Sequence, residues 1–177
     1  MGQERYIPEI INDYNVYGGK KADKCIGVTD ATQLPTMDQI TETISGAGIL
    51  GTYETGVPGQ YGSLEQEINF RNLNEDIFSI ADPTEPVSLT MRGSEQLTDR
   101  NTGALTYRGV RIVERGRLKK FDPGKLENGK SMGSKVTLEL FYYMIEVNNK
   151  VMLEYDKLNS VYKLNGKDML AKIKQYS

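Results

Sequence analysis

The sequence has 177 residues, of which 38% are hydrophobic, with 22 lysine and arginine residues against 24 acidic residues. This length is enough for one domain with a full core, and we expect a single domain over residues 1–177. The net charge of −2 argues against a general nucleic-acid binder, the absence of histidine removes the commonest general base and metal ligand, and the single cysteine excludes an intrachain disulfide.

The first part of the chain predicts an extended arm and two short strands. The arm covers residues 1–17, which mix apolar and polar side chains around Pro8. The apolar run in residues 25–28 predicts a strand whose cysteine is buried and inert, because no histidine is present to activate it. The alternation in residues 37–44 predicts the second strand.

A glycine-rich segment follows these strands. Gly46, Gly48 and Gly51 form a literal G-x-G-x-x-G, which in dinucleotide-binding proteins follows a buried strand and opens a helix. Here the preceding strand is half polar, and the glycines and proline of residues 56–62 are incompatible with a helix. We therefore expect no cofactor, and we predict a long mobile loop over residues 46–62 that serves surface contacts and assembly.

The rest of the chain reads as antiparallel strands with two short helices. Residues 63–71 alternate with period two, and Asn74 is a good N-cap for a helix ending at Ile80. The other predicted strands are 87–98, 105–121, 136–147 and 151–155, and a final helix over 169–175 is expected to be capped by Asp168. The fold class that follows is mainly β, an antiparallel β-barrel or sandwich with one or two short helices.

Two charged clusters are candidate functional sites. Glu65 and Glu67 lie on the polar face of their strand, where solvated charge is the usual explanation and a catalytic carboxylate pair is the alternative. Arg111, Arg115 and Arg117 share strand parity and form a basic stripe. The stripe is either a solvated face that discourages edge pairing or a surface for an acidic partner.

Six segments, taken in order, cover nearly the whole chain and resemble one known family. They are ITETISGAG (40–48), FRNLN (70–74), LTMRG (89–93), GVRIVERG (109–116), VTLEL (136–140) and LEYDKLNSVYKLNG (153–166). Together they resemble the major tail tube protein of contractile-tailed phages, which also occurs in phage-derived R-type bacteriocins.

The resemblance implies a structural subunit and not an enzyme. Its fold would be a small β-barrel or sandwich with a flanking helix, similar to the inner tube of type VI secretion. Hexameric rings would stack into a hollow tube inside a contractile sheath, and the tube would pierce the target envelope and conduct DNA in a phage. The implied partners are further copies of the chain, the sheath protein, a baseplate or tube initiator and a tape measure protein inside the tube. The location would be a virion tail or an extracellular bacteriocin particle, assembled in the bacterial host cytoplasm.

Three groups of residues become candidates under this interpretation. They are an inter-ring assembly loop with Leu50, Tyr53, Val57 and Tyr61, lumen candidates Glu65 and Glu67, and sheath-facing candidates Arg111, Arg115 and Arg117. The alternative functions are a monomeric β-barrel that binds a ligand under a glycine-rich lid and an enzyme that uses the two glutamates.

Overall fold

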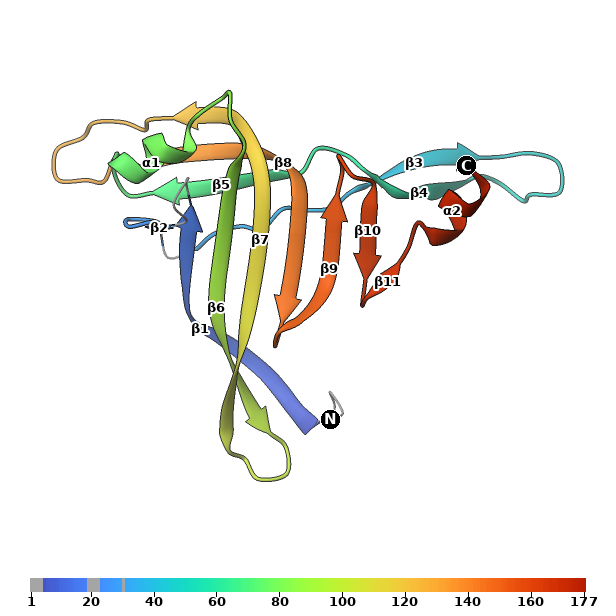
Figure 1. The fold of residues 1–177 in the computed structure, drawn as a ribbon, viewed down its shortest axis with the longest axis horizontal. Coiled ribbons are helices and arrows are strands. Elements are labelled where there is room, and N and C mark those ends of the chain that lie inside the picture. The colour runs from blue at the N-terminus through green and yellow to red at the C-terminus, as the bar shows by residue number, and fades with distance from the viewer. Residues whose placement is uncertain (1–4, 19–22, 30) are drawn as a thin grey trace.

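A computed structural model describes residues 5–18, 23–29 and 31–177, and it is mainly β (Figure 1). All strand pairs are antiparallel. This confirms the predicted fold class. The elements are β1 (Tyr6–Gly18), β2 (Asp23–Lys24), β3 (Gln39–Ile44), β4 (Tyr53–Tyr61), β5 (Glu65–Phe70), α1 (Glu75–Ile80), β6 (Val87–Asp99), β7 (Leu105–Asp122), β8 (Ser134–Val147), β9 (Lys150–Asp156), β10 (Val161–Leu164), β11 (Lys167–Asp168) and α2 (Ala171–Tyr176).

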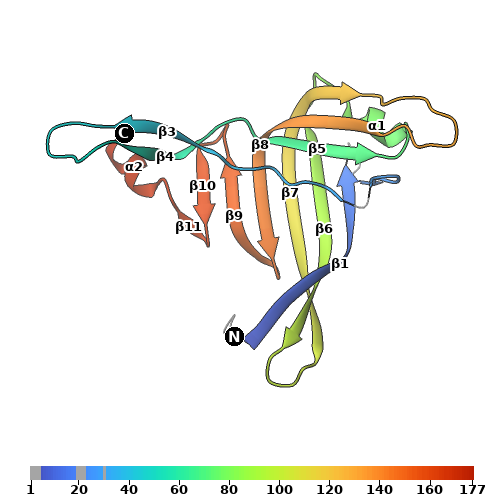
Figure 2. The same ribbon diagram turned by 180° about the vertical axis from the view of Figure 1, so that it is seen from behind.

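One large sheet organises the molecule. Its nine strands run in the order β11-β10-β9-β8-β7-β6-β1-β2, and β5 pairs with β8 off this path. The upper ends of β7 and β8 turn over the top of the sheet and run beside β5 (Figures 1 and 2). Irregular register accompanies this turn, after Arg115 and again around Lys119, as expected where bulges bend a strand.

The hydrophobic core fills the angle between the large sheet and the layer formed by β5 and the upper ends of β7 and β8. The alternation predicted for residues 63–71 is confirmed, since Leu64, Gln66, Ile68 and Phe70 are all fully buried. Other fully buried side chains come from α1, β6 and β8: Ile77, Ile80, Leu89, Val136, Leu138 and Leu140.

Helix α1 closes one end of the core. Asn74 caps it as predicted, accepting a hydrogen bond from the Ile77 backbone N–H at 3.1 Å. Its amide group also donates to the Ile26 carbonyl at 2.7 Å, which ties the helix start to the connection before β3. Ile77 and Ile80 then point into the core.

Glu114 is a fully buried carboxyl group on the core-facing side of β7. Neither of its oxygens has a hydrogen-bond partner among the described residues. It lies opposite Leu89 of β6 and Tyr143 of β8 in the sheet register. Burial raises the pKa of the Glu114 carboxyl from 4.5 to about 8, so the neutral acid is the favoured form in the core at neutral pH.

The region before β3 differs from the sequence prediction. Residues 25–28 form no strand; only Val28 makes an isolated bridge, to Phe70. The run is too short and is interrupted by Gly27, whose φ of 85° is incompatible with a regular strand. Cys25 is nevertheless buried as predicted, and desolvation raises its pKa to about 11.

The prediction of a long mobile loop over residues 46–62 is also wrong. Most of it is strand β4, which pairs with β3 to make a hairpin, so that only residues 45–52 are a tip. Pro58 is tolerated because it lies in the register break between Gly56 and Tyr61, where β4 has no ladder partner on β3. The segment is therefore an ordered two-stranded arm, here called the β3–β4 hairpin (residues 39–61).

The structure also differs from the prediction at both ends of the chain. The part of the predicted arm that the structure describes is strand β1, paired along its length with β6, whereas residues 1–4 lie outside the described residues. The last helix begins at Ala171, and Leu170 is its N-cap without a side-chain cap bond. Asp168 lies too early to cap it and instead accepts a hydrogen bond from the Leu170 N–H at 2.8 Å.

Candidate assembly surfaces

The β3–β4 hairpin projects far from the rest of the molecule (Figures 1 and 2). Leu50 at its tip is fully exposed, and Tyr53 and Val57 are 55% and 41% exposed. Among the described residues, β3 and β4 pair only with each other, so each keeps an unpaired edge. Exposed apolar side chains on a projecting arm with open edges are typical of a segment that another chain covers.

The charge of the hairpin is uniform. Its only charged residues are Glu42 and Glu54, and no lysine or arginine occurs between Lys24 and Arg71 in the sequence. The tip itself, residues 45–52, carries no charged side chain. The hairpin therefore offers an apolar, uncharged end on an acidic stem.

Tyr61 has a different role from the other three assembly candidates. Its ring lies edge-on against Tyr155 and Tyr162, with centroids 5.1 and 5.6 Å apart, and its hydroxyl group donates to the Tyr162 oxygen at 2.8 Å. Tyr155 in turn donates to the Gly59 carbonyl at 3.1 Å. These three tyrosines, the tyrosine cluster, anchor the base of the hairpin to β9 and β10.

Replacing Tyr61 with phenylalanine is expected to lower the free energy of unfolding by about 0.5–1.5 kcal/mol. The change keeps the ring packing but removes the hydroxyl that bonds to Tyr162 and leaves that partner poorly satisfied. Urea denaturation measures the loss. Tyr53→Phe is the control, because Tyr53 is exposed on the same strand; an equal loss in both variants would contradict the anchoring role.

Helix α2 lies beside the hairpin in both views (Figures 1 and 2). Leu170, just before it, packs against Gly59 of β4, where a Cβ atom would collide with the leucine side chain. The helix buries none of its own residues, and Ile173 and Tyr176 are exposed. The end of the molecule that carries the hairpin thus exposes a second set of apolar side chains.

The two lumen candidates lie on the outward face of β5, as their alternation predicted. Each is paired with a lysine: Glu65 with Lys119 at 2.6 Å and Glu67 with Lys135 at 3.3 Å. Glu139 of β8 joins the first pair, contacting Lys119 and Ser63. This surface therefore carries balanced charges and not the purely acidic strip that the sequence suggested.

The pairing also weakens the carboxylate-enzyme alternative. A catalytic acid of this kind needs an apolar, buried setting that holds its proton at neutral pH. Glu65 and Glu67 instead lie on an open face, each beside a lysine side chain that is itself partly exposed. Neither glutamate has the surroundings that this chemistry requires.

The basic stripe lies on the outward face of β7. Arg111, Arg115 and Arg117 do share this face, opposite the core-facing Ile112 and Glu114. Arg111 is paired with Glu146 at 2.6 Å, and Arg115 stacks on the ring of Tyr142 at 4.1 Å. The stacking holds Arg115 in place without neutralising it.

Arg117 is the most available cation of the stripe. It is exposed, and no ion pair of Arg117 is formed within residues 5–18, 23–29 and 31–177. Together, Arg115 and Arg117 leave two uncompensated charges on an open sheet face, which suits an acidic partner surface.

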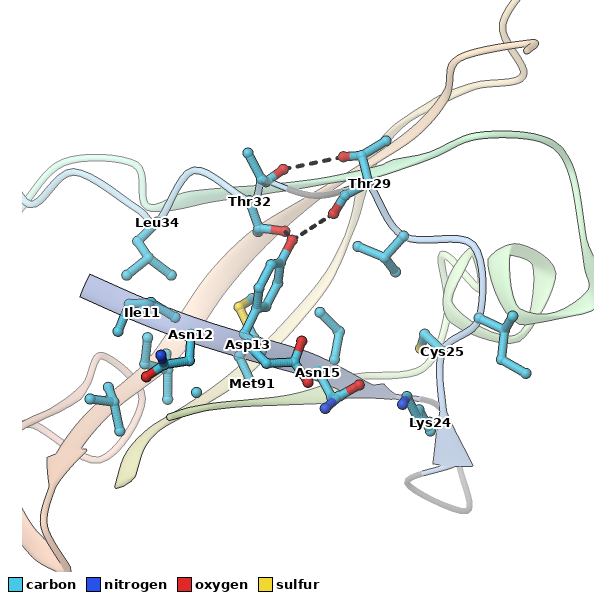
Figure 3. Close-up of a pocket in the computed structure, with 18 of the residues that line it drawn as sticks. Ile11, Asn12, Asp13, Asn15, Lys24, Cys25, Thr29, Thr32, Leu34 and Met91 are labelled. Atoms are coloured by element: carbon cyan, nitrogen blue, oxygen red, sulfur yellow. Dashed lines mark hydrogen bonds between the residues drawn. The ribbon is translucent and has the colours of Figure 1, made fainter. Parts of the chain in front are cut away.

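A groove of about 960 Å³ opens at the opposite end of the sheet from the hairpin (Figure 3). Its floor is the core-facing side of β1, β6 and β7, and its roof is the connection formed by residues 24–29 and 31–34. Tyr14 of β1 props the roof, with its hydroxyl group bonded to the Thr29 carbonyl at 2.7 Å and to the Thr32 hydroxyl at 3.0 Å. No hairpin residue lines the groove, so the hairpin is not a lid over it within one subunit.

Sequence reasoning missed the tyrosine cluster and the groove. Tyr61, Tyr155 and Tyr162 lie on three strands that are distant in sequence, and each looks like an ordinary strand tyrosine. The groove depends on the path of the roof, of which residues 25–28 were predicted to be a strand. The excess of 11 tyrosines over 4 phenylalanines was the available signal for hydroxyl-bonded packing.

The described part of the chain shows no candidate metal site and no candidate membrane-spanning helix. It contains no group of three or more acidic or cysteine side chains arranged to hold a metal ion. None of its helices has the length and apolar character needed to cross a membrane.

Comparison with known proteins places the chain in a family. The family model of phage tail tube protein FII matches residues 8–176. The tail tube protein of Escherichia phage P2 is 27% identical over 147 residues, which cover 81% of this chain and 83% of the relative. The major tail tube protein of Serratia phage KSP20 is 26% identical over 144 residues, covering 81% of each.

A solved structure supports the fold. A chain of an extracellular contractile injection system, described as its PVC sheath/tube terminator in the extended state, matches with a TM-score of 0.53 at 11% identity. The match covers 79% of this chain and 97% of that chain. The predicted resemblance is thus confirmed: the chain belongs to the phage tail tube protein FII family, whose members are structural tail proteins and not enzymes.

Proposed function

We propose that this chain is the subunit that self-assembles into stacked hexameric rings, which form the hollow inner tube of a contractile phage tail or related injection particle. The observation that carries the proposal is the β3–β4 hairpin, an ordered arm with exposed apolar side chains and open strand edges. In a monomer such an arm would be an aggregation hazard, whereas in an assembly a neighbour covers it. Leu50, Tyr53 and Val57 are the proposed inter-ring contact residues, with Tyr61 as their anchor.

The same reasoning supports ring formation through the large sheet. Its terminal strands, β2 and β11, are only two residues long, and among the described residues β2 pairs with two of the 13 residues of β1 and β11 with two of the four of β10, which leaves open edges. Pairing of these edges between adjacent subunits would satisfy exposed backbone groups and close the sheet into a continuous ring.

For the interior of the tube we propose the outward face of β5. Glu65 and Glu67, paired with Lys119 and Lys135, would give a lumen wall with little net charge. Such a wall would let DNA pass, because unbalanced fixed cations would bind its phosphates. Two cysteine substitutions, Glu65→Cys and Glu67→Cys, test this: in intact tubes a bulky maleimide that cannot enter the lumen should fail to label them. Rapid labelling would contradict the assignment.

The competing assignment is that Arg115 and Arg117 face the sheath. Arg117 and Glu65 both lie opposite Glu139 in the sheet register, so they share one face and only one of the two assignments can hold. If the arginines face the sheath, the double variant Arg115→Glu/Arg117→Glu is expected to form tubes normally but to lose co-sedimentation with the sheath protein, because the attraction becomes a repulsion. Lys172→Glu on α2 is the control for a change of surface charge. Normal sheath recruitment by the double variant would rule out this orientation.

We also propose partners and a location for the tube. A baseplate component would start the tube and a tape measure protein would occupy its interior during assembly in the bacterial host cytoplasm. The finished tube would lie inside the sheath of a virion tail or an extracellular bacteriocin particle, where it pierces the target envelope.

Negative-stain electron microscopy of the purified protein tests the central claim, combined with size-exclusion chromatography at rising concentration. We expect rings or hollow tubes and a concentration-dependent shift to larger species. A monomer at every concentration, even after addition of the particle's baseplate, would refute self-assembly.

A further inference from the structure

We infer that the groove beneath residues 24–29 and 31–34 is the receptor for the β3–β4 hairpin tip of a second copy of this chain. The inference rests on the proposed function and adds to it the surface that each tip meets. The tip is defined as residues 45–52 and the groove by its floor on β1, β6 and β7.

The chemistry of the two surfaces matches. The tip is uncharged and ends in Ile49 and the fully exposed Leu50. The groove floor presents Ile11, which is 52% exposed, and the partly buried Val110, and Ile26 on its roof is 73% exposed. Covering these side chains with Leu50 would remove apolar surface from water on both partners, which is the main favourable term in association.

The shape of the tip suits entry into a confined space. Gly48 and Gly51 adopt φ values of 85° and 90°, and a Cβ atom on either would meet nothing within 4 Å. The subunit itself therefore leaves room for side chains, and the backbone conformation alone selects glycine. The result is a thin tip that can enter a groove of about 960 Å³ beneath its roof.

The charged residues are compatible with this docking. Among the described residues, the groove is lined by one lysine, Lys24, near its edge, and one acid, Asp13, on the floor strand β1 (Figure 3). With the tip inserted, the acidic stem residues Glu42 and Glu54 would remain at the mouth, where Lys24 can face them. The two glutamates and Lys24 would then compensate one another, so none of these three charges would be buried without a partner, which is the usual obstacle to such a contact.

The position of the two surfaces explains why the partner is a second copy. The hairpin and the groove lie at opposite ends of the molecule, so a hairpin cannot reach the groove of its own subunit (Figures 1 and 3). A contact between different surfaces of identical chains is head-to-tail, and it repeats until it closes or continues as a filament. One tip and one groove per subunit then suffice for an extended assembly.

Disulfide trapping tests the contact. The parent protein carries Cys25→Ala, so that only introduced cysteines react, and the test variant adds Ile26→Cys on the roof and Leu50→Cys on the tip. Oxidation of assembled tubes is expected to give a ladder of covalent oligomers on a non-reducing gel. The matched control pairs Leu50→Cys with Leu126→Cys, which is more exposed than Ile26 (87% against 73%) but lies in the loop between β7 and β8, and it should remain largely monomeric.

The outcomes separate the inference from the proposed function. If tubes form but the Ile26→Cys/Leu50→Cys variant stays monomeric on the gel, or cross-links no better than the control, the groove is not the receptor. If the parent protein forms no tubes even with a baseplate nucleus, the proposed function itself fails.

A second experiment needs no cysteine. Leu50→Asp is expected to lower the assembled fraction at least tenfold, whereas Leu126→Asp leaves it unchanged, with both proteins folded by circular dichroism. Equal assembly of the two variants would overturn the inference.

Discussion

Replacing Glu114 with glutamine is expected to stabilise the protein strongly at alkaline pH and hardly at all in acid. The carboxyl group is fully buried without hydrogen-bond partners among the described residues, and burial raises its pKa from 4.5 to about 8. Below pH 4.5 both the folded and the unfolded chain carry the proton, so glutamine, which resembles the neutral acid, changes little. Between pH 4.5 and about 8 the unfolded chain has lost the proton and the folded chain has not.

The sign and size of the effect follow from this difference. Because the folded state binds the extra proton, the contribution of Glu114 to stability falls as the pH rises, by about 1.4 kcal/mol per pH unit. Over the whole window the variant should gain on the order of 3–5 kcal/mol relative to the parent. Urea denaturation at several pH values and one protein concentration measures it.

Glu42→Gln is the control for Glu114→Gln, since Glu42 is exposed on β3. Its pH dependence should match that of the parent protein. If Glu114→Gln also follows the parent at every pH, then Glu114 is solvated and its burial in the core is wrong.

Replacing Gly116 with alanine is the second substitution for which we expect a large effect. Gly116 lies on β7 where the strand begins to turn over the sheet, and a Cβ atom there would overlap the backbone carbonyl of Glu139 on β8. A backbone atom cannot rotate away as a side chain can, so the two strands must separate. We expect a loss of about 1–3 kcal/mol or more, which is typical of overpacking.

Gly109→Ala provides a matched control on the same strand. A Cβ atom on Gly109 meets nothing within 4 Å, so alanine is expected to be neutral or to stabilise the protein by about 0.4–1 kcal/mol through the unfolded chain. Thermal or urea denaturation of the two variants gives the comparison. Equal stability would mean that β7 and β8 are not in close contact at Gly116.

The sequence was most informative where one face of a strand is buried. The alternation of residues 63–71 correctly identified the core face of β5, and the Asn74 cap and the long strands β6, β7 and β8 were found from similar local signals. These signals arise within a few residues, because period and capping depend on neighbours in the chain.

The errors occurred where tertiary pairing decides the structure. Gly56, Pro58 and Gly59 argue against any regular element, yet β3 pairs with Gly56 and Tyr61 on either side of the register break that contains Pro58 and Gly59, and so keeps this segment extended in strand β4. Strand propensity depends strongly on such context. The short strands β10 and β11 were likewise missed, since their sequence, Val161–Leu164 and Lys167–Asp168, contains little alternation to detect.

In the candidate sites, too, the features set by a local pattern were predictable and those set by tertiary contacts were not. The shared face of Arg111, Arg115 and Arg117 follows from parity alone and was predictable. The lysine partners of Glu65 and Glu67 come from β7 and β8 and were not, because a pair between distant segments has no signature in one sequence.

The anchoring of the hairpin has a mechanical consequence. Strands β3 and β4 are joined through the tip, so a pull on the tip along the arm is carried by two covalent backbones, whereas peeling one strand from the other breaks their cross-strand hydrogen bonds one after another. The tyrosine cluster at the base then passes the load into β9, the neighbour of β8 in the large sheet, and into β10 beside it. An arm built in this way resists stretching far better than peeling. A column that is pushed along its own axis needs this kind of strength at the joints between its segments.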